Sequence, residues 1–137
     1  MSNFEDELVA DMRAHGGTAS KGFVAGHPLL IMTNEGAKSG ESRRAILTYS
    51  RDDGDYVVAA TAGGSPKDPA WIHNVRGNPE VTIEVNLETI PATATLVEEG
   101  PERDRLWDQH VAALPWFADY PAQTGRLIPM VRLTPRR

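Results

Sequence analysis

Hydrophobic and polar residues alternate over several short stretches of the chain, a pattern typical of β-strands with one buried face. The clearest stretch is 80–86, in which Val81, Ile83 and Val85 fall on one face. Segments of this kind, together with short apolar runs, predict about six strands. They lie at residues 28–33, 44–51, 55–61, 80–86, 88–97 and 128–133. The Asp-Asp-Gly sequence at 52–54 is a turn signal, so the second and third strands should form a hairpin.

Helices are predicted where apolar residues recur every three or four positions. This spacing indicates a first helix over 3–14, with acidic residues in its first turn, and a long helix over 102–114. Between them a short helix should begin at Asp68-Pro69, with Asp68 as its cap and Pro69 at its first position. Segment 116–125 contains three aromatic residues and is expected to be irregular.

The order of these elements favours an antiparallel arrangement of the strands. Most strands follow one another directly, and the strand–helix–strand alternation of a parallel sheet is missing. Short strands in this number, over 137 residues, favour a small barrel over an open sheet. We therefore expect a mainly β, α+β fold with about three flanking helices. It should form one domain over residues 1–137, in which residues 1–27 are a helix and a loop.

Composition removes several classes of function. The chain has no cysteine, which excludes disulfide scaffolds, thiolate metal sites and cysteine nucleophiles. With 14 basic and 19 acidic residues its net charge is -5, so broad nucleic-acid binding is disfavoured. No apolar run approaches the roughly 20 residues of a membrane-spanning helix, and the acidic N-terminus does not resemble a signal peptide. These features suit a cytoplasmic protein.

Two loops in this acidic chain are candidates for binding an anionic ligand. Residues 36–44 combine two glycines with Lys38 and Arg43, whose charges suit phosphate or carboxylate groups. Residues 61–67 contain a glycine pair between a strand and a helix, where backbone N–H groups can hold an anion. Each loop taken alone is also compatible with a solvated hairpin turn or a plain strand-to-helix connection.

The short helix and the aromatic segment offer surfaces for a flat ligand. Trp71 and Asn74 are three positions apart, so they share a helix face that presents a ring and an amide. Trp116, Phe117 and Tyr120 either plug one end of the barrel or line a pocket. The four histidines lack metal-ligand spacing, and no Gly-x-Ser-x-Gly motif or acid–base pair stands out. This set of residues suits an enzyme whose reactivity comes from a cofactor.

Several motifs resemble those of the deazaflavin-dependent nitroreductase family, which are split β-barrel oxidoreductases that use coenzyme F420. The resemblance covers most of the chain, from Pro28 to Pro135, and rests on the order and spacing of the motifs. They are Leu29–Thr33 with Gly36–Gly40, Gly63–Trp71, His73-Asn74, Asn78–Val81, Glu102–Trp107, Asp119-Tyr120 and Ile128-Pro129. The resemblance implies an FMN-binding-like split β-barrel. It also implies hydride transfer from reduced F420 to an electron-poor acceptor such as a quinone, an enone or a nitro-compound.

The resemblance also implies roles for individual residues. The phosphate and the acidic tail of the cofactor would be bound by Lys38, Ser39, Gly40 and Arg43. The residues that would lie along the deazaflavin ring or face it are Ala45, Ile46, Ala60, Thr61, Ala62, Gly63, Trp71 and Asn74. Tyr120 is the candidate catalytic residue over the substrate face, and Leu114 and Phe117 would lie beside it in the substrate pocket.

The chain departs from the family pattern at two places. Thr61-Ala62 stands where members often carry Ser-Lys, so one cation at the cofactor is missing. Leu114 and Phe117 replace rings with hydroxyl groups, so the pocket has fewer groups that can donate a proton. Reduction of nitroimidazoles therefore does not follow from the resemblance.

Two other functions stay open from the sequence. The chain is also compatible with an FMN-dependent oxidoreductase on a similar barrel, and with a non-catalytic carrier of the deazaflavin. The expected partner is a small-molecule electron acceptor, with no nucleic acid and no metal. A homodimer and a peripheral membrane contact for a quinone remain options, so the expected location is the cytoplasm with membrane association left open. The apolar side of the first helix could cover the site, a partner or a membrane.

Overall fold

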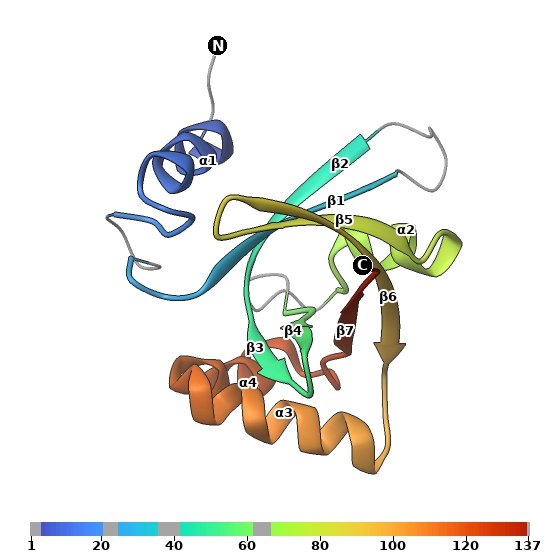
Figure 1. Ribbon diagram of the computed structural model, residues 1–137. Helices are drawn as coiled ribbons and strands as arrows, with labels where there is room; N and C mark the ends of the chain where they lie inside the picture. The colour runs from blue at the N-terminus through green and yellow to red at the C-terminus, as the bar shows by residue number, and fades with distance from the viewer. Residues whose placement is uncertain (1–3, 21–24, 36–41, 62–66, 137) are drawn as a thin grey trace.

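A curled sheet of seven antiparallel strands forms the centre of the computed structural model, which describes residues 4–20, 25–35, 42–61 and 67–136 (Figure 1). The strands are β1 Leu29–Glu35, β2 Ser42–Thr48, β3 Ser50–Asp52, β4 Asp55–Ala59, β5 Glu80–Val85, β6 Glu88–Val97 and β7 Met130–Pro135. Their order in space is β2-β1-β5-β6-β7-β4-β3, and every neighbouring pair is antiparallel. The predicted antiparallel fold is confirmed, with one strand more than expected.

The additional strand arises because the predicted strand 44–51 bends at Tyr49. β2 pairs with β1, whereas β3 pairs with β4 at the opposite edge of the sheet. Tyr49 alone separates the two strands, and its N–H donates to the carbonyl of Pro28 at 3.2 Å. Its ring contacts that of Tyr56 edge-on, with 5.1 Å between centroids. Tyr49 is therefore packed like a residue of a strand, and the alternation of apolar and polar residues in the sequence continues through the bend. The hairpin predicted at 52–54 is confirmed for β3 and β4.

Four α-helices and a 3₁₀ helix lie around the sheet in the described residues (Figure 1). They are α1 Phe4–Ala14, α2 Ala70–Gly77, α3 Pro101–Ala113, the 3₁₀ helix η2 Pro115–Asp119, and α4 Tyr120–Thr124. The three predicted helices are confirmed as α1, α2 and α3. The prediction for segment 116–125 was wrong, because Pro115 and Pro121 each lie in the first turn of a helix and favour helical backbone there.

The cap predicted for α2 was also wrong. The N-cap residue is Pro69, and it makes no side-chain capping bond. The Asp68 carboxylate is used elsewhere, since its Oδ1 accepts a hydrogen bond from Nη1 of Arg126 at 3.0 Å. A long-range ion pair has therefore replaced the local cap.

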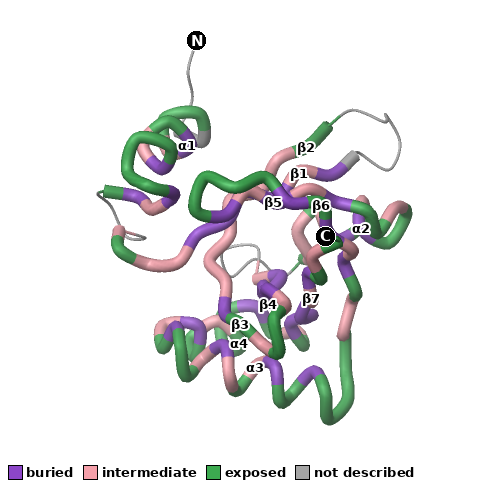
Figure 2. The backbone as a smooth tube through the Cα atoms, in the orientation of Figure 1, coloured by how far each residue is buried: buried purple, intermediate pink, exposed green. Residues whose placement is uncertain are grey.

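Side chains from the two faces of the sheet enter separate clusters. The main core, within the curl of the sheet, consists of Leu30, Met32, Tyr56, Val58, Ala60, Ile72, Val75, Val81, Ile83, Val85, Ile90, Ala92, Ala94, Val131 and Leu133. A second cluster joins the opposite sides of β4 and β7 to α3 and η2 through Val57, Ala59, Met130, Leu106 and Phe117. Figure 2 shows that many of the buried positions lie along the strands of the sheet.

Helix α1 packs its apolar side on β1 and β2, and an ion pair joins it to β5. Val9 and Met12 are buried against Leu29 and Ile31 in a third cluster. Arg13 donates two hydrogen bonds to the Glu84 carboxylate, at 2.9 and 3.1 Å. The apolar side of this helix is therefore used against its own sheet. No helix in the described ranges is long and apolar enough to cross a membrane.

A set of charged side chains, which we call the ionic cluster, joins α3 to β3, β4 and β7. Its members are Asp52, Asp55, Glu102, Arg105 and Arg132. Asp52 accepts from Arg132 at 2.6 Å and from Arg105 at 2.9 and 3.0 Å, and Asp55 accepts from Arg132 at 2.8 Å. The hydrogen bonds from Arg105 and Arg132 hold the pKa of Asp52 well below its usual range. Asp52 therefore stays ionised and bound to both arginines at neutral pH.

Candidate functional site

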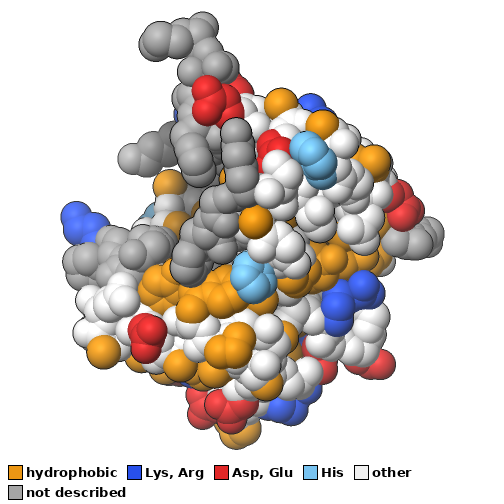
Figure 3. All heavy atoms as spheres, turned by 90° about the vertical axis from the view of Figure 1, so that its left-hand side faces the viewer, with side chains coloured by type: hydrophobic (Ala, Val, Ile, Leu, Met, Phe, Trp, Pro, Cys, Tyr) orange, Lys and Arg blue, Asp and Glu red, His pale blue; other side chains and the backbone are white. Residues whose placement is uncertain are grey.

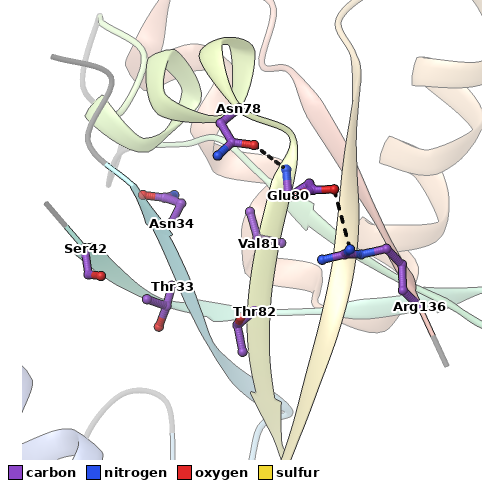
Figure 4. A pocket seen from close by; sticks show the side chains of 8 residues that line it. All are labelled: Thr33, Asn34, Ser42, Asn78, Glu80, Val81, Thr82 and Arg136. Carbon is purple, nitrogen blue, oxygen red and sulfur yellow. Dashed lines mark hydrogen bonds and ion pairs between the residues drawn. The ribbon is translucent and has the colours of Figure 1, made fainter. Parts of the chain in front are cut away.

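A polar pocket opens where β1 ends and where β2 and β5 begin (Figure 4). It has a volume of about 240 Å³, and its lining residues are Thr33, Asn34, Ser42, Asn78, Glu80, Val81, Thr82 and Arg136. The strand register places Thr33 beside Thr82, and Arg136 from the end of β7 forms an ion pair with Glu80 at 3.6 Å. Hydroxyl, amide, carboxylate and guanidinium groups therefore surround one small space, so it can donate and accept hydrogen bonds.

A basic hollow of about 550 Å³ adjoins the polar pocket, with Thr33 and Ser42 in both linings. Its other lining residues are Arg43 and Arg44. Arg44 forms an ion pair with Asp6 of α1 at 2.5 Å. Arg43, which was predicted to bind the acidic tail of a cofactor, is exposed near the start of β2. Two guanidinium groups on one hollow make this part of an acidic chain attractive to an anion.

Asn34, in the wall of the polar pocket, is a buried side chain with an incomplete set of hydrogen bonds. It is 4% exposed, and its Oδ1 accepts from Nδ2 of Asn74 at 3.3 Å. Among the described residues, Nδ2 of Asn34 has no hydrogen-bond partner. An unpaired buried N–H destabilises a protein by about 1–3 kcal/mol, so such a group calls for an explanation, and a ligand is one. Asn34 is not among the residues predicted from the sequence, because its partner Asn74 lies 40 positions away along the chain.

Helix α2 brings two predicted site residues to this region. Ile72 and Val75 are buried in the main core, and this orientation leaves Trp71 and Asn74 half-buried on the flank of the helix. Asn74 is the residue that donates to Asn34. The i, i+3 spacing of Trp71 and Asn74 therefore places both where a ligand at the polar pocket could reach them.

Ala60 and Thr61 continue the chain beyond β4. The Ala60 side chain is buried in the main core, while Thr61 is half-buried. Their carbonyl oxygens accept hydrogen bonds from Nη2 of Arg126 at 2.9 and 3.1 Å. The backbone at this predicted cofactor-binding segment is therefore held by a residue that the sequence analysis missed.

Ala45 and Ile46 lie next to each other on β2, so their side chains point to opposite faces of the sheet. Ala45 packs against the main core, and Ile46 packs with the cluster under α1. Only one of these two side chains can therefore face a given ligand. Five further predicted residues, namely Lys38, Ser39, Gly40, Ala62 and Gly63, lie outside the described residues.

The predicted substrate residues belong to an aromatic cluster built by α3, η2 and α4. Phe117 is at its centre, with ring centroids within 6.5 Å at Trp107, His110, Trp116 and Tyr120. Phe117 is 6% exposed and Leu114 is 1% exposed, whereas Tyr120 is half-buried. Figure 3 shows hydrophobic side chains forming a band across the face that α1 shares with η2 and α4. Tyr120 is therefore the most accessible of the three, with the other two packed beneath the surface.

His110 is the buried titratable group nearest to this cluster. Its Nδ1 lies 2.7 Å from Oγ of Ser50, and Nε2 has no partner among the described residues. Burial lowers the pKa of His110 to about 4, so the ring is neutral at pH 7. Its contacts with Ser50 and Phe117 make this histidine part of the packing between β3, α3 and η2.

The described part of the site fits an elongated, anionic cofactor. The basic hollow suits a phosphate or carboxylate tail, and the buried Asn34 amide, which accepts a hydrogen bond from Asn74, suits a polar ring edge. Across the described ranges, no group of three or more His, Cys, Asp or Glu side chains could hold a metal ion. Fold and site together define a small split β-barrel protein with a cationic, polar binding region.

Comparison with known proteins gives the family. Residues 6–135 match the model of the F420H(2)-dependent quinone reductase family, and the chain belongs to this family. An F420H(2)-dependent quinone reductase of Mycobacterium tuberculosis is 37% identical over 113 residues, which cover 80% of this chain and 74% of that protein. The family resemblance expected from the motifs is thereby confirmed.

Two solved structures share the fold at similar identity. An F420-H2 dependent reductase, FDR-A, is 38% identical with a TM-score of 0.70, and the match covers 77% of this chain and 93% of that one. A structure described as a domain-swapped dimer is 35% identical with a TM-score of 0.71, and covers 94% of this chain and 93% of that one. The split-barrel expectation is confirmed by these matches.

Proposed function

We propose that this protein is an oxidoreductase that passes a hydride from reduced coenzyme F420 to an electron-poor acceptor, with a quinone as the first choice. The observation that carries the proposal is the match of residues 6–135 to the F420H(2)-dependent quinone reductase family. The basic hollow and the unpaired donor of Asn34 support it, because they suit an anionic and polar cofactor. When bound, the reduced deazaflavin supplies the hydride.

The residues of the chain bind and orient the reactants. Arg43, with Lys38, Ser39 and Gly40, would hold the phosphate and acidic tail of the cofactor through charge-assisted hydrogen bonds. The residues that would lie beside the ring are Ala60, Thr61, Ala62, Gly63, Trp71 and Asn74, together with either Ala45 or Ile46 of β2. Their contribution is proximity and orientation, together with backbone N–H groups that stabilise developing charge.

Tyr120 is proposed to position the acceptor. It is half-buried at the edge of the aromatic cluster, and Phe117 supports its ring from below at 5.2 Å between centroids. Leu114 and Phe117 contribute apolar surface and no hydroxyl, so Tyr120 or water delivers the proton that a reduced quinone requires. In the variant Tyr120→Phe, we expect a slower turnover with a quinone at an unchanged affinity for F420. Unchanged kinetics would remove Tyr120 from the mechanism.

The direct experiment mixes the purified protein with reduced F420 and a menaquinone analogue and follows oxidation of the cofactor. Turnover above the rate without protein is the expected result. Tight binding of F420 without turnover of any quinone, enone or nitro-compound would instead indicate a carrier. Binding of FMN in place of F420 would indicate an FMN-dependent enzyme.

A homodimer is part of the proposal. Its support is the similarity, at 35% identity, to a structure described as a domain-swapped dimer. Light scattering coupled to size-exclusion chromatography should give a mass of two chains at micromolar concentration. A mass of one chain would contradict the dimer and leave the proposed reaction unaffected.

A further inference from the structure

Arg126 lies where three segments of the proposed site meet. It follows α4, the helix that begins with Tyr120, and comes directly after Gly125, whose φ of 66° ends that helix in the left-handed conformation. Its side chain is 16% exposed. A largely buried arginine outside the ionic cluster requires partners that compensate for its lost hydration.

The guanidinium group reaches two segments that are distant from it in the sequence. One nitrogen, Nη2, donates to the carbonyl oxygens of Ala60 and Thr61 at 2.9 and 3.1 Å. The other, Nη1, donates to Oδ1 of Asp68 at 3.0 Å. Asp68 stands just before α2, which carries Trp71. One side chain therefore connects the end of β4, the start of α2 and the end of α4.

The backbone that carries this side chain is itself fixed. The N–H of Arg126 donates to Oγ1 of Thr124 at 3.1 Å, and the Thr124 hydroxyl donates to the carbonyl of Arg126 at 3.2 Å. Thr124 is 5% exposed. The guanidinium group thus starts from a turn held by two hydrogen bonds, so its three hydrogen bonds to described residues transmit position from one segment to the others.

The chemistry of arginine suits this arrangement better than that of lysine. A planar guanidinium presents several N–H groups in fixed directions and can serve two carbonyls and a carboxylate together. An ammonium is a compact charge on a flexible stem and would have to choose among these partners. The contacts therefore use the shape of the group as well as its charge.

We propose that Arg126 is a positioning residue that holds the backbone of Ala60 and Thr61 in register with Trp71 and Tyr120. The proposal rests on the proposed function, in which Ala60, Thr61 and Trp71 contact the cofactor and Tyr120 contacts the acceptor. It follows that cofactor affinity and the productive alignment of the acceptor depend on a residue assigned to neither binding surface.

The test compares Arg126→Met and Arg126→Lys with the wild type. Affinity for F420 is measured by the fluorescence change on binding, and kcat and KM are measured with a menaquinone analogue. Loss of the charged hydrogen bonds in Arg126→Met should raise the Kd for F420 roughly tenfold and lower kcat. Arg126→Lys should recover part of the affinity and less of kcat. It restores the positive charge but lacks the planar guanidinium group, whose N–H donors point in fixed directions.

Arg76→Met is the matched control. Arg76 also approaches the Asp68 carboxylate, at 4.0 Å, and pairs with Glu98, but no hydrogen bond joins it to Ala60 or Thr61 in the described structure. This variant should keep the wild-type Kd and kcat. A change equal to that of Arg126→Met would mean that any loss of charge near Asp68 suffices, and would overturn the positioning role.

Hydrogen exchange of the cofactor-free protein gives a second readout. In Arg126→Met, we expect faster exchange at the N–H groups of Ala60 and Thr61, which bond to the carbonyls of Pro129 and Ala59 at 3.0 Å each. A variant that is only less stable, with wild-type Kd and kcat well below its melting temperature, would overturn the inference. If the wild type itself neither binds nor oxidises reduced F420, the proposed function fails first, and the positioning role fails with it.

Discussion

The two ends of the sheet treat polar groups in opposite ways. At the end formed by β3, β4 and β7, Asp52 and Asp55 are each bound by arginines within the ionic cluster. At the end formed by β1, β2 and β5, Arg43 lines an open hollow. There the buried N–H of Asn34 lacks a partner among the described residues. The first end pairs acidic side chains with arginines inside the ionic cluster, whereas the second combines a hollow lined by arginines with a buried donor that has no described partner.

This difference separates the sources of stability and of binding. Mutually bonded charges stabilise the fold and leave little for a ligand to gain. A buried N–H group without a partner lowers stability slightly, and it raises the affinity for a ligand that accepts its hydrogen bond. Substitutions at the first end should therefore change the free energy of unfolding, and substitutions at the second should change ligand affinity.

The largest effect is expected at the ligand-binding end. Replacing both Lys38 and Arg43 by alanine should weaken F420 binding by roughly 3–6 kcal/mol, since each charged hydrogen bond contributes roughly 1.5–3 kcal/mol. The loss should shrink as salt is added, because exposed charges are screened. Titration of F420 at low and high ionic strength measures both. Equal affinity in wild type and double variant would refute the assignment of the cofactor tail to this loop.

The next largest effect is a pH dependence at the end formed by β3, β4 and β7, where Nδ1 of His110 lies within hydrogen-bond distance of Ser50 on β3. The pKa of His110 is about 4 in the folded protein, below its usual value of 6.5, so the unfolded chain binds more protons between these values. Stability should therefore fall by about 3 kcal/mol as the pH drops through this window, and level off below it. Urea unfolding at several pH values measures the slope. His110→Gln, the control, should lose most of it, and an unchanged slope would assign the effect to other groups.

Asp52→Asn tests the ionic cluster directly. Removal of the charge weakens bonds to both Arg105 and Arg132, so we expect a loss of about 2 kcal/mol in the free energy of unfolding. Glu84→Gln is the matched control, because it weakens the more exposed pair with Arg13 and should cost less than about 1 kcal/mol. Both are measured by urea unfolding at pH 7. Equal losses would show that burial of the cluster adds nothing.

The smallest effect on stability is expected for Asn34→Leu. The variant removes a buried N–H that has no partner in the described structure. The free energy of unfolding should therefore either rise or fall by less than about 1 kcal/mol. Affinity for F420 should fall, since Asn74 loses the oxygen to which it donates. Thermal unfolding and F420 titration of the same preparation separate the two. A less stable variant with full affinity would mean that Asn34 serves the fold alone.

Local patterns in the sequence predicted much of this fold. The hairpin at 52–54, the alternation over 80–86 and the helical spacing of α1, α2 and α3 depend on neighbouring residues, and the structure confirms them. The bend at Tyr49 escaped prediction because apolar alternation continues through it. The helical form of 116–125 escaped prediction because a proline can follow the end of one helix or lie in the first turn of another, as Pro115 and Pro121 do.

The residues of the candidate site also divide into those that the sequence predicts and those that it does not. Trp71 and Asn74 could be paired from their i, i+3 spacing, and the family resemblance supplied the remaining candidates. Asn34 and Arg126 could not be found by either route, because their partners lie 40 to 66 positions away in the sequence. The roles of Asn34 and Arg126 depend on contacts that form only when the chain folds.

The bend at Tyr49 also determines which strands form the two edges of the sheet. β2 is one of them, with β1 as its sole sheet neighbour in the described part of the chain. A marginal strand offers backbone N–H and C=O groups to any extended chain, and charged side chains on it make such additions unfavourable. Arg43 and Arg44 lie on β2. The charges proposed to attract a cofactor therefore also stand where they disfavour strand addition, and we expect a variant that removes them to lose solubility together with affinity.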